Sequence, residues 1–188
     1  MRIFSTLPIN FKYYAAICGL LAISSCGQKF NAELPPIDAE ENVISNFDKG
    51  KELLAKKQYT LSILEFDSAI AINPRIAAIY KYRGLAKAGK EEFQPAILDI
   101  KTAIDLNPFD ISLNYEKANI EYEANLLDSA IYDYTKVIQK DSSFDDAYLN
   151  RGLANLKKGL KQNACIDFNL ASKFGNTNAL GLIEENCK

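Results

Sequence analysis

Three carboxylates that recur at a fixed spacing are the first residues in this chain that could do chemistry. Asp99, Asp133 and Asp167 follow one another at equal intervals along the sequence. Paired carboxylates catalyse acid–base reactions when unlike surroundings separate their pKa values. A position repeated at a constant period gives each carboxylate similar surroundings, which favours a packing or solvated role. The chain also has no histidine, which removes the usual catalytic base and the commonest zinc ligand. We therefore expect no catalytic residue, no metal site and no cofactor.

The first 25 residues have the composition of an export signal. Arg2 and Lys12 are the only charged residues before Cys26, and apolar and small residues fill positions 15–25. This run is shorter than the roughly 20 apolar residues that a membrane-spanning helix needs. A basic start, a short apolar run and small residues at its end are typical of a secretory signal that is removed. Without Arg2 and Lys12 the 22 Lys and Arg fall to 20, against 24 Asp and Glu, so the net charge is −4. With no basic block, we expect no nucleic-acid partner.

Residues 23–26, Ile-Ser-Ser-Cys, resemble the lipobox of bacterial lipoproteins. In that family the signal is cut before the cysteine, which carries two or three acyl chains, enough for a lasting hold on a membrane. The resemblance implies that Cys26 is lipidated and that the protein is exported to the bacterial cell envelope. Gly27 is compatible with the outer membrane, and the membrane face stays open. The alternative is an ordinary signal with a chance cysteine. Residues 26–42, with a stiff Pro-Pro pair, are interpreted as the lipidated cysteine and a tether.

Cys165 and Cys187 are left as a pair if Cys26 carries lipid. Disulfides persist in the compartments that exported proteins reach. Cys165 falls on the last predicted helix pair and Cys187 near the end of the helix that follows. A disulfide between them would fasten that terminal helix, and two free or buried thiols are the alternative.

A repeat of about 34 residues organises the rest of the sequence and positions the carboxylates. Four copies align through a small residue, a second small residue twelve positions later, a large apolar residue and a final small or branched residue. In chain order these positions hold Gly50, Gly84, Ala118 and Gly152; Ser62, Ala96, Ala130 and Ala164; Phe66, Ile100, Tyr134 and Phe168; Ala69, Ala103, Val137 and Ala171. A fixed period of this size predicts stacked supersecondary units. Glycine inside a helix costs about 1 kcal/mol relative to alanine, so its recurrence predicts the close approach of a neighbouring helix.

These positions resemble the tetratricopeptide repeat (TPR). The second copy matches it through Gly84, Ala96, Ile100, Ala103 and Pro108. The family has an aromatic residue where this chain has Leu53, Lys87, Glu121 and Asn155, and the third and fourth copies lack its proline. The resemblance implies an all-α, right-handed tetratricopeptide-repeat α-solenoid of about four helix-turn-helix repeats plus a C-terminal capping helix. The implied boundaries are 43–76, 77–110, 111–144 and 145–176 for the repeats and 177–188 for the cap.

Local signals predict where individual helices begin and end. In the second repeat we expect helices over Ala77–Gly89 and Phe93–Leu106, because Asn107-Pro108 disfavours helical geometry at its first residue. Ser143 and Asp146 have the spacing of a capping box for the next helix. Gly175 would end the last paired helix, and a capping helix would follow over Asn178–Asn186.

The family binds proteins and peptides in a concave groove lined by the first helix of each pair. The residues that the resemblance places there are Phe47, Lys51, Lys81, Leu85, Tyr115, Asn119, Tyr122, Asp146 and Leu149. Tyr115, Asn119 and Tyr122 combine aromatic area with hydrogen-bonding groups, which is typical of recognition patches. The alternative is that these tyrosines simply cover a helix face. Phe47 and Leu85 stand where members that bind acidic chaperone C-termini have polar groups, so that specificity is not predicted.

The expected function is therefore a non-catalytic, lipid-anchored scaffold of the bacterial cell envelope. Its partners would be a protein or peptide in the groove and a membrane through the lipid anchor, with no nucleic acid and no small-molecule substrate. Two alternatives stay open. One is an accessory of an envelope enzyme, or a cell-wall hydrolase acting through its carboxylates. The other is a structural homo-oligomer in which a second copy fills the groove.

Overall fold

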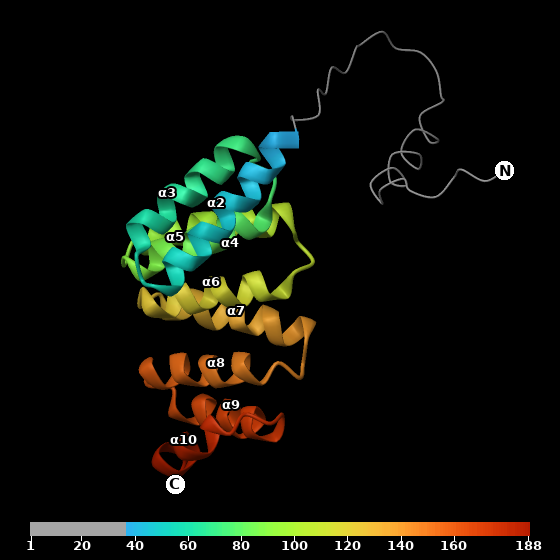
Figure 1. Ribbon diagram of the computed structural model, residues 1–188. Helices are drawn as coiled ribbons and strands as arrows, with labels where there is room; N and C mark the ends of the chain where they lie inside the picture. Colours follow the sequence, from blue (N-terminus) through green and yellow to red (C-terminus); the bar gives the residue numbers. More distant parts are fainter. Residues whose placement is uncertain (1–36) are drawn as a thin grey trace, which may run out of the picture. The chain divides into compact units, whose positions relative to one another are not determined.

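The computed structural model describes residues 37–188, which lie in one compact unit, and all the helices named below belong to it. Cys26 and the predicted signal over residues 1–25 lie outside the described residues. Within residues 37–188 the structure contains nine helices and no strand (Figure 1). In chain order they are α2 (Ile37–Ala55), α3 (Tyr59–Ile72), α4 (Ala77–Gly89), α5 (Phe93–Leu106), α6 (Ile111–Glu123), α7 (Leu127–Lys140), α8 (Asp145–Lys157), α9 (Lys161–Lys173) and α10 (Asn178–Asn186).

The helices form four hairpins that stack in the order of the chain. The pairs α2/α3, α4/α5, α6/α7 and α8/α9 pack within themselves, and each hairpin then contacts the next (Figure 1). Helix α10 packs against α9. The predicted all-α solenoid with a terminal helix is confirmed, and α4, α5 and α10 have the expected bounds. Helix α2 begins at Ile37, so residues 37–42, which are predicted from the sequence to belong to the tether, are helical.

Recurring glycines let the two helices of a hairpin approach closely. A Cβ atom on Gly50 would lie 2.5 Å from the ring of Phe66, and one on Gly152 would lie 2.6 Å from Phe168. Both rings are fully buried. Because the two helices lie so close together, the Ser62 hydroxyl donates a hydrogen bond to the Gly50 carbonyl at 2.8 Å. The sequence prediction of close packing at these glycines is confirmed, and the contact lies inside each hairpin.

The turn inside each hairpin places a residue in the left-handed region. Lys57, Glu91, Asn125 and Gly159 occupy equivalent positions of the four repeats and have φ between 58° and 84°. In each turn the next residue donates its N–H to a carbonyl five residues back, as Glu92 does to Lys87 at 2.9 Å. This is the Schellman ending, which satisfies carbonyls at the helix terminus. Only the fourth copy uses glycine, which adopts this conformation without steric cost.

The predicted capping box at Ser143 and Asp146 is wrong. Helix α8 begins at Asp145 and its start has no side-chain capping bond. Ser143 instead donates from both its N–H and its hydroxyl to the Asp141 carboxylate, at 2.9 and 2.7 Å. Asp146 accepts a hydrogen bond from Asn176 at 2.8 Å. The turn before α8 therefore bonds within itself, and Asp146 ties α8 to the segment before α10.

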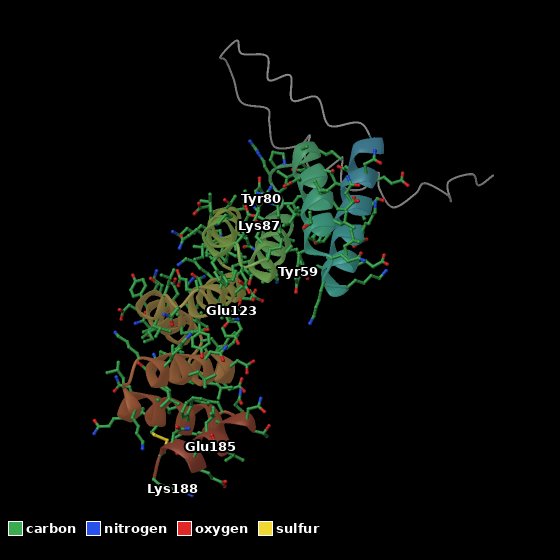
Figure 2. All side chains as sticks on the ribbon, turned by 90° about the vertical axis from the view of Figure 1, so that its left-hand side faces the viewer. Tyr59, Tyr80, Lys87, Glu123, Glu185 and Lys188 are labelled. Atoms are coloured by element: carbon green, nitrogen blue, oxygen red, sulfur yellow. A yellow bond between two sulfur atoms is a disulfide. The ribbon has the colours of Figure 1, made fainter. Side chains whose placement is uncertain are left out.

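A disulfide joins Cys165 on α9 to Cys187 directly after α10, with the two Cα atoms 5.6 Å apart (Figure 2, yellow bond near Glu185). The two cysteines are 22 residues apart in the sequence. Closing a loop of this length limits the unfolded chain and stabilises a fold by about 3 kcal/mol. The last hairpin and the terminal helix are thus fastened covalently as well as by packing around the buried Ala179.

Candidate functional site

The first helices of three successive hairpins line a hollow of about 360 Å³. Its lining includes Phe47 and Lys51 from α2 and Lys81 and Tyr82 from α4. Asp110, the residue that caps the start of α6, lines it as well. Asp110 holds this wall in place by accepting the N–H of Ser112 at 3.0 Å. The hollow lies where the sequence predicts a groove, and three of the predicted groove residues line it.

The hollow contains two aromatic rings, and two lysines lie against them. The rings of Phe47 and Tyr82 meet edge to face with centroids 5.5 Å apart, and Phe47 also packs on the buried Phe66. Lys51 lies 4.8 Å above the Phe47 ring and pairs with Asp48 at 2.9 Å. Lys81 lies 5.4 Å from the Tyr82 centroid and has no ion-pair partner among the residues that the structure describes. Asp110, which also lines the hollow, forms no ion pair within the part of the chain that the structure describes. Such a surface offers a partner apolar area, one unpaired cation and one unpaired carboxylate.

The predicted recognition patch on α6 is engaged in contacts inside the protein. Asn119 accepts hydrogen bonds from the buried Tyr134 hydroxyl at 2.7 Å and from Asn150 at 3.1 Å. Asn150 also donates to the Tyr115 hydroxyl at 2.9 Å, which ties α6 to α8. Burial raises the pKa of Tyr115, and the nearby Asp146 charge adds to the shift. These side chains join the third and fourth hairpins, which gives them a structural role, and their recognition role stays a prediction.

The other predicted groove residues differ in how accessible they are. Leu149 is only 8% exposed and belongs to the core of the last hairpin, so its expected role as a groove contact is corrected. Leu85 is half-buried against the core of the second hairpin. The Lys157 Nζ atom lies 5.0 Å from the centroid of the Tyr122 ring. Asp146, in the fourth hairpin, is exposed. The predicted groove positions are therefore accessible at both ends of the stack, and the hollow lies in the N-terminal half.

An ion pair joins the two helices of every hairpin. Four cations on the first helices meet four acids on the second helices, and both sets recur with the period of the repeat. The pairs are Lys49–Glu65 at 2.6 Å, Arg83–Asp99 at 2.7 and 2.8 Å, Lys117–Asp133, and Arg151–Asp167 at 2.7 and 3.0 Å. Both arginine pairs are bidentate, the strongest geometry for such contacts. We call this set the ion-pair ladder.

The ladder explains the recurring carboxylates. Asp99, Asp133 and Asp167 are all buried and each contacts a cation. Their oxygens are occupied by hydrogen bonds that hold the hairpins closed, which agrees with a packing role. The matching cations were not predicted, although Lys49, Arg83, Lys117 and Arg151 show the same period. Within residues 37–188 no three His, Cys, Asp or Glu side chains gather in a way that could hold a metal ion.

In two ion pairs of the ladder the arginine also donates a hydrogen bond to the preceding hairpin. Arg83 donates to Asp67 on α3 at 2.6 Å, and Arg151 donates to Thr135 on α7 at 3.1 Å. Burial lowers the pKa of Arg83, but its hydrogen bonds to Asp99 and Asp67 outweigh this and raise it overall. The equivalent position before Lys117 is Lys101, which cannot accept a hydrogen bond. The junction between the second and third hairpins therefore lacks this bond.

Comparisons with known proteins agree with this architecture. A family profile described as "TPR repeat" matches residues 118–159. The small glutamine-rich tetratricopeptide repeat-containing protein 2 of Saccharomyces cerevisiae is 25% identical over 131 residues, covering 69% of this chain and 38% of that protein. The chain thus spans little more than a third of the length of this relative.

Solved structures show the same fold. The crystal structure of MamA matches with a TM-score of 0.67 and 26% identity, covering 76% of this chain and 84% of that chain. The first TPR of Spaghetti (RPAP3), bound to the HSP90 peptide SRMEEVD, matches with a TM-score of 0.59 and 16% identity, over 63% of this chain and 94% of that one. The fold of residues 37–188 is that of a TPR α-solenoid, which is suited to binding proteins and peptides.

None of the described helices combines the length and the apolar character that a bilayer crossing requires.

Proposed function

We propose that this chain is a non-catalytic, lipid-anchored scaffold of the bacterial cell envelope that binds a protein or peptide in its first-helix groove. The observation that carries the proposal is the hollow lined by α2, α4 and the start of α6. It offers the rings of Phe47 and Tyr82 beside Lys51 and Lys81. Aromatic side chains with a few charged groups are the composition of binding surfaces. The HSP90 peptide bound to a structurally similar TPR provides an analogy for a peptide in this groove.

Two features support the envelope location. Residues 23–26 have the lipobox pattern and follow a signal-like segment. The Cys165–Cys187 disulfide fits an oxidising compartment, since such bonds are rare where glutathione keeps thiols reduced. Lipidation at Cys26 would hold the compact unit at a membrane by a short tether. The outer membrane is the favoured membrane because Gly27 follows the cysteine.

The groove is tested by capture of partners from envelope extracts. We expect a Lys51→Glu/Lys81→Glu variant to lose the proteins that the natural sequence retains, because the change replaces both cations of the hollow by carboxylates without touching the core. Lys101→Glu/Lys140→Glu is the matched control, with two exposed lysines elsewhere on the surface. Equal recovery by all three proteins would place the binding surface outside the groove.

The anchor is tested separately. Cells that express the full chain are labelled with a radioactive fatty acid, and we expect label on the natural protein and none on Cys26→Ser. The variant should also move from the membrane to the soluble fraction. Label that persists in Cys26→Ser, or membrane attachment that does not change, would refute lipidation at this cysteine while leaving the groove result intact.

A further inference from the structure

A second surface of the molecule carries apolar side chains at a constant period. Leu64, Leu98, Tyr132 and Ile166 occupy the same position of α3, α5, α7 and α9, and they are 56, 65, 62 and 60% exposed. We call them the outer row. Single exposed apolar residues are ordinary on proteins. Four of them at one phase of four successive hairpins form an organised stripe, and such stripes mark interaction surfaces.

The outer row points away from the core by the geometry of the helix. The large residues Phe66, Ile100, Tyr134 and Phe168 follow two positions later on the same helices and are fully buried. Two residues correspond to about 200° of rotation around an α-helix, so the outer row lies on the opposite side from these core residues. The groove hollow is lined by first helices and by the turn before α6. The outer row, which belongs to second helices alone, is therefore a separate surface.

The same surface contains a hollow next to the outer row. It measures about 300 Å³ and lies between α7, α8 and α9. Ile131 and Ile166 form apolar walls, while Arg151, Asn155 and Asp167 give a polar floor. Ile166 belongs both to the wall and to the outer row. An amphipathic side chain fits such a site, with an aromatic ring against the walls and a hydroxyl near the floor.

Tyr132 has this chemistry and projects from the same face. The Tyr132 side chain is exposed, and the Lys136 Nζ atom lies 4.2 Å from the centroid of its ring. Tyr132 lies on α7, and Ile131 and Thr135 of the same helix line the hollow. One surface thus holds both a protruding side chain and a site that suits it. Two copies related by a two-fold axis can satisfy both at once, because each supplies the same patch to the other.

We propose that the outer face binds a second copy of this chain, with Tyr132 of each copy in the α7/α9 hollow of the other. With the two stacks antiparallel, α9 of each copy then faces the space between α5 and α7 of the other, which brings Ile166 toward Leu98. Charges of both signs flank the row, including Asp128 and Lys136 on α7. Mixed charge suits self-pairing better than it suits an anionic membrane, which attracts a basic face. The dimer leaves both grooves open, so it is independent of the proposed function.

The test is the mass of residues 27–188 in solution, measured by sedimentation velocity across about 1 to 100 µM. This stretch contains the whole compact unit, with its four apolar cores and its disulfide. We expect a monomer–dimer equilibrium. Tyr132→Glu/Ile166→Glu should weaken it by about a hundredfold or more, because two interface anchors are lost. Asn163→Trp, which fills the hollow from within its own molecule, should weaken it as well.

The matched control is Phe109→Glu, which removes a 92% exposed aromatic residue on the turn between α5 and α6, outside the row. It should leave the dimer unchanged, and thermal melts should show that every variant folds. A monomer at all concentrations, or equal weakening by Phe109→Glu, overturns the proposal. Loss of the dimer in Lys51→Glu/Lys81→Glu also overturns it, because the second copy would then occupy the groove. Monomers that bind phosphatidylethanolamine vesicles through Tyr132 would identify a membrane as the occupant instead.

Discussion

The second and third hairpins fill the same repeat positions with different chemistry. In the second, Arg83 and Lys87 face Asp99, and Arg83 also reaches Asp67, so two cations meet two acids at 2.6 to 2.7 Å. In the third, Lys117 alone lies between Glu121 and Asp133, and the further cation, Lys136, is 3.5 Å from Asp133 with a side chain that is 44% exposed. One hairpin has a balanced network and the other has too few cations in its interior.

Two buried polar atoms of α6 have no partner. One Glu121 carboxylate oxygen and the Asn114 amide nitrogen are buried and form no hydrogen bond. Asn114 occupies the repeat position that holds Tyr80 in the second hairpin and Tyr148 in the fourth. The Tyr80 hydroxyl donates to the Pro74 carbonyl at 3.1 Å, and the Tyr148 hydroxyl donates to the Ser142 carbonyl at 3.3 Å. Unsatisfied buried groups cost about 1–3 kcal/mol each. We infer that a repeat period preserves the backbone while local substitutions decide which unit is least stable, and here that unit is the third.

Removal of the ladder acid should separate the two hairpins most strongly. Asp99→Ala leaves Arg83 and Lys87 without their shared partner and should destabilise the fold by about 3 kcal/mol, as for a broken buried ion pair. Asp133→Ala leaves Lys117 paired with Glu121 and should cost about half as much by the same reasoning. Urea unfolding followed by circular dichroism measures both. Equal losses in the two variants would show that the difference in charge balance has no energetic effect.

Neutralising Glu121 should stabilise the third hairpin. Burial raises the pKa of Glu121 above its ordinary value of 4.5, and the Asp133 charge adds to this, although Lys117 opposes it. The ionised carboxylate therefore destabilises the fold at neutral pH, and this penalty disappears as the pH falls toward 4.5. We expect Glu121→Gln to gain about 1–2 kcal/mol at pH 7, with a smaller gain in mildly acidic buffer. A gain that is constant with pH would assign the effect to packing.

A tyrosine at position 114 should copy the anchor of the neighbouring repeats. In Asn114→Tyr the hydroxyl is expected to reach the carbonyl of Pro108, as Tyr80 reaches Pro74 one repeat earlier. The gain should be about 1 kcal/mol, the usual net worth of a hydrogen bond. Asn114→Phe is the control, because it adds the ring without the hydroxyl. Identical thermal stabilities of the two variants would contradict the expected bond.

The smallest effect is expected at the junction between the second and third hairpins. Lys101→Asp would supply the acceptor that Asp67 provides to Arg83. A partly exposed pair of this kind contributes about 0.5 kcal/mol, and salt should weaken it. Thermal melts at low and high ionic strength measure the gain. The same substitution in a Lys117→Met background should give no gain if the new pair forms as expected.

The sequence was sufficient to predict the fold because its signals are local. Gly50 and Gly152 favour close neighbours, and Asn107-Pro108 disfavours helical geometry at its first residue. These properties depend on few residues, so helix bounds such as Phe93–Leu106 agree with the structure. The capping prediction failed because Ser143 has two local partners at similar spacing, and only the backbone conformation decides that Asp141 is the one used.

The site was less predictable because accessibility depends on neighbouring hairpins. Leu149 and Lys81 both belong to first helices, yet Leu149 is buried with α9 and α10 in the core at the C-terminal end, whereas Lys81 lines the hollow. The periodic sequence places a side chain on a helix face but does not say what the next unit puts against it. The hydrogen bonds among Tyr115, Asn119 and Asn150 join residues 31 and 35 positions apart, which no local pattern indicates.

The covalent bond at the C-terminal end gives the stack a direction of unfolding. In a linear array each unit is held only by its neighbours, so disruption starts at the ends. The Cys165–Cys187 bond prevents α10 from peeling away from α9, whereas α2 has neighbours on one side only and no covalent fastening. Fraying under heat or mechanical tension should thus begin at α2 and not at α10.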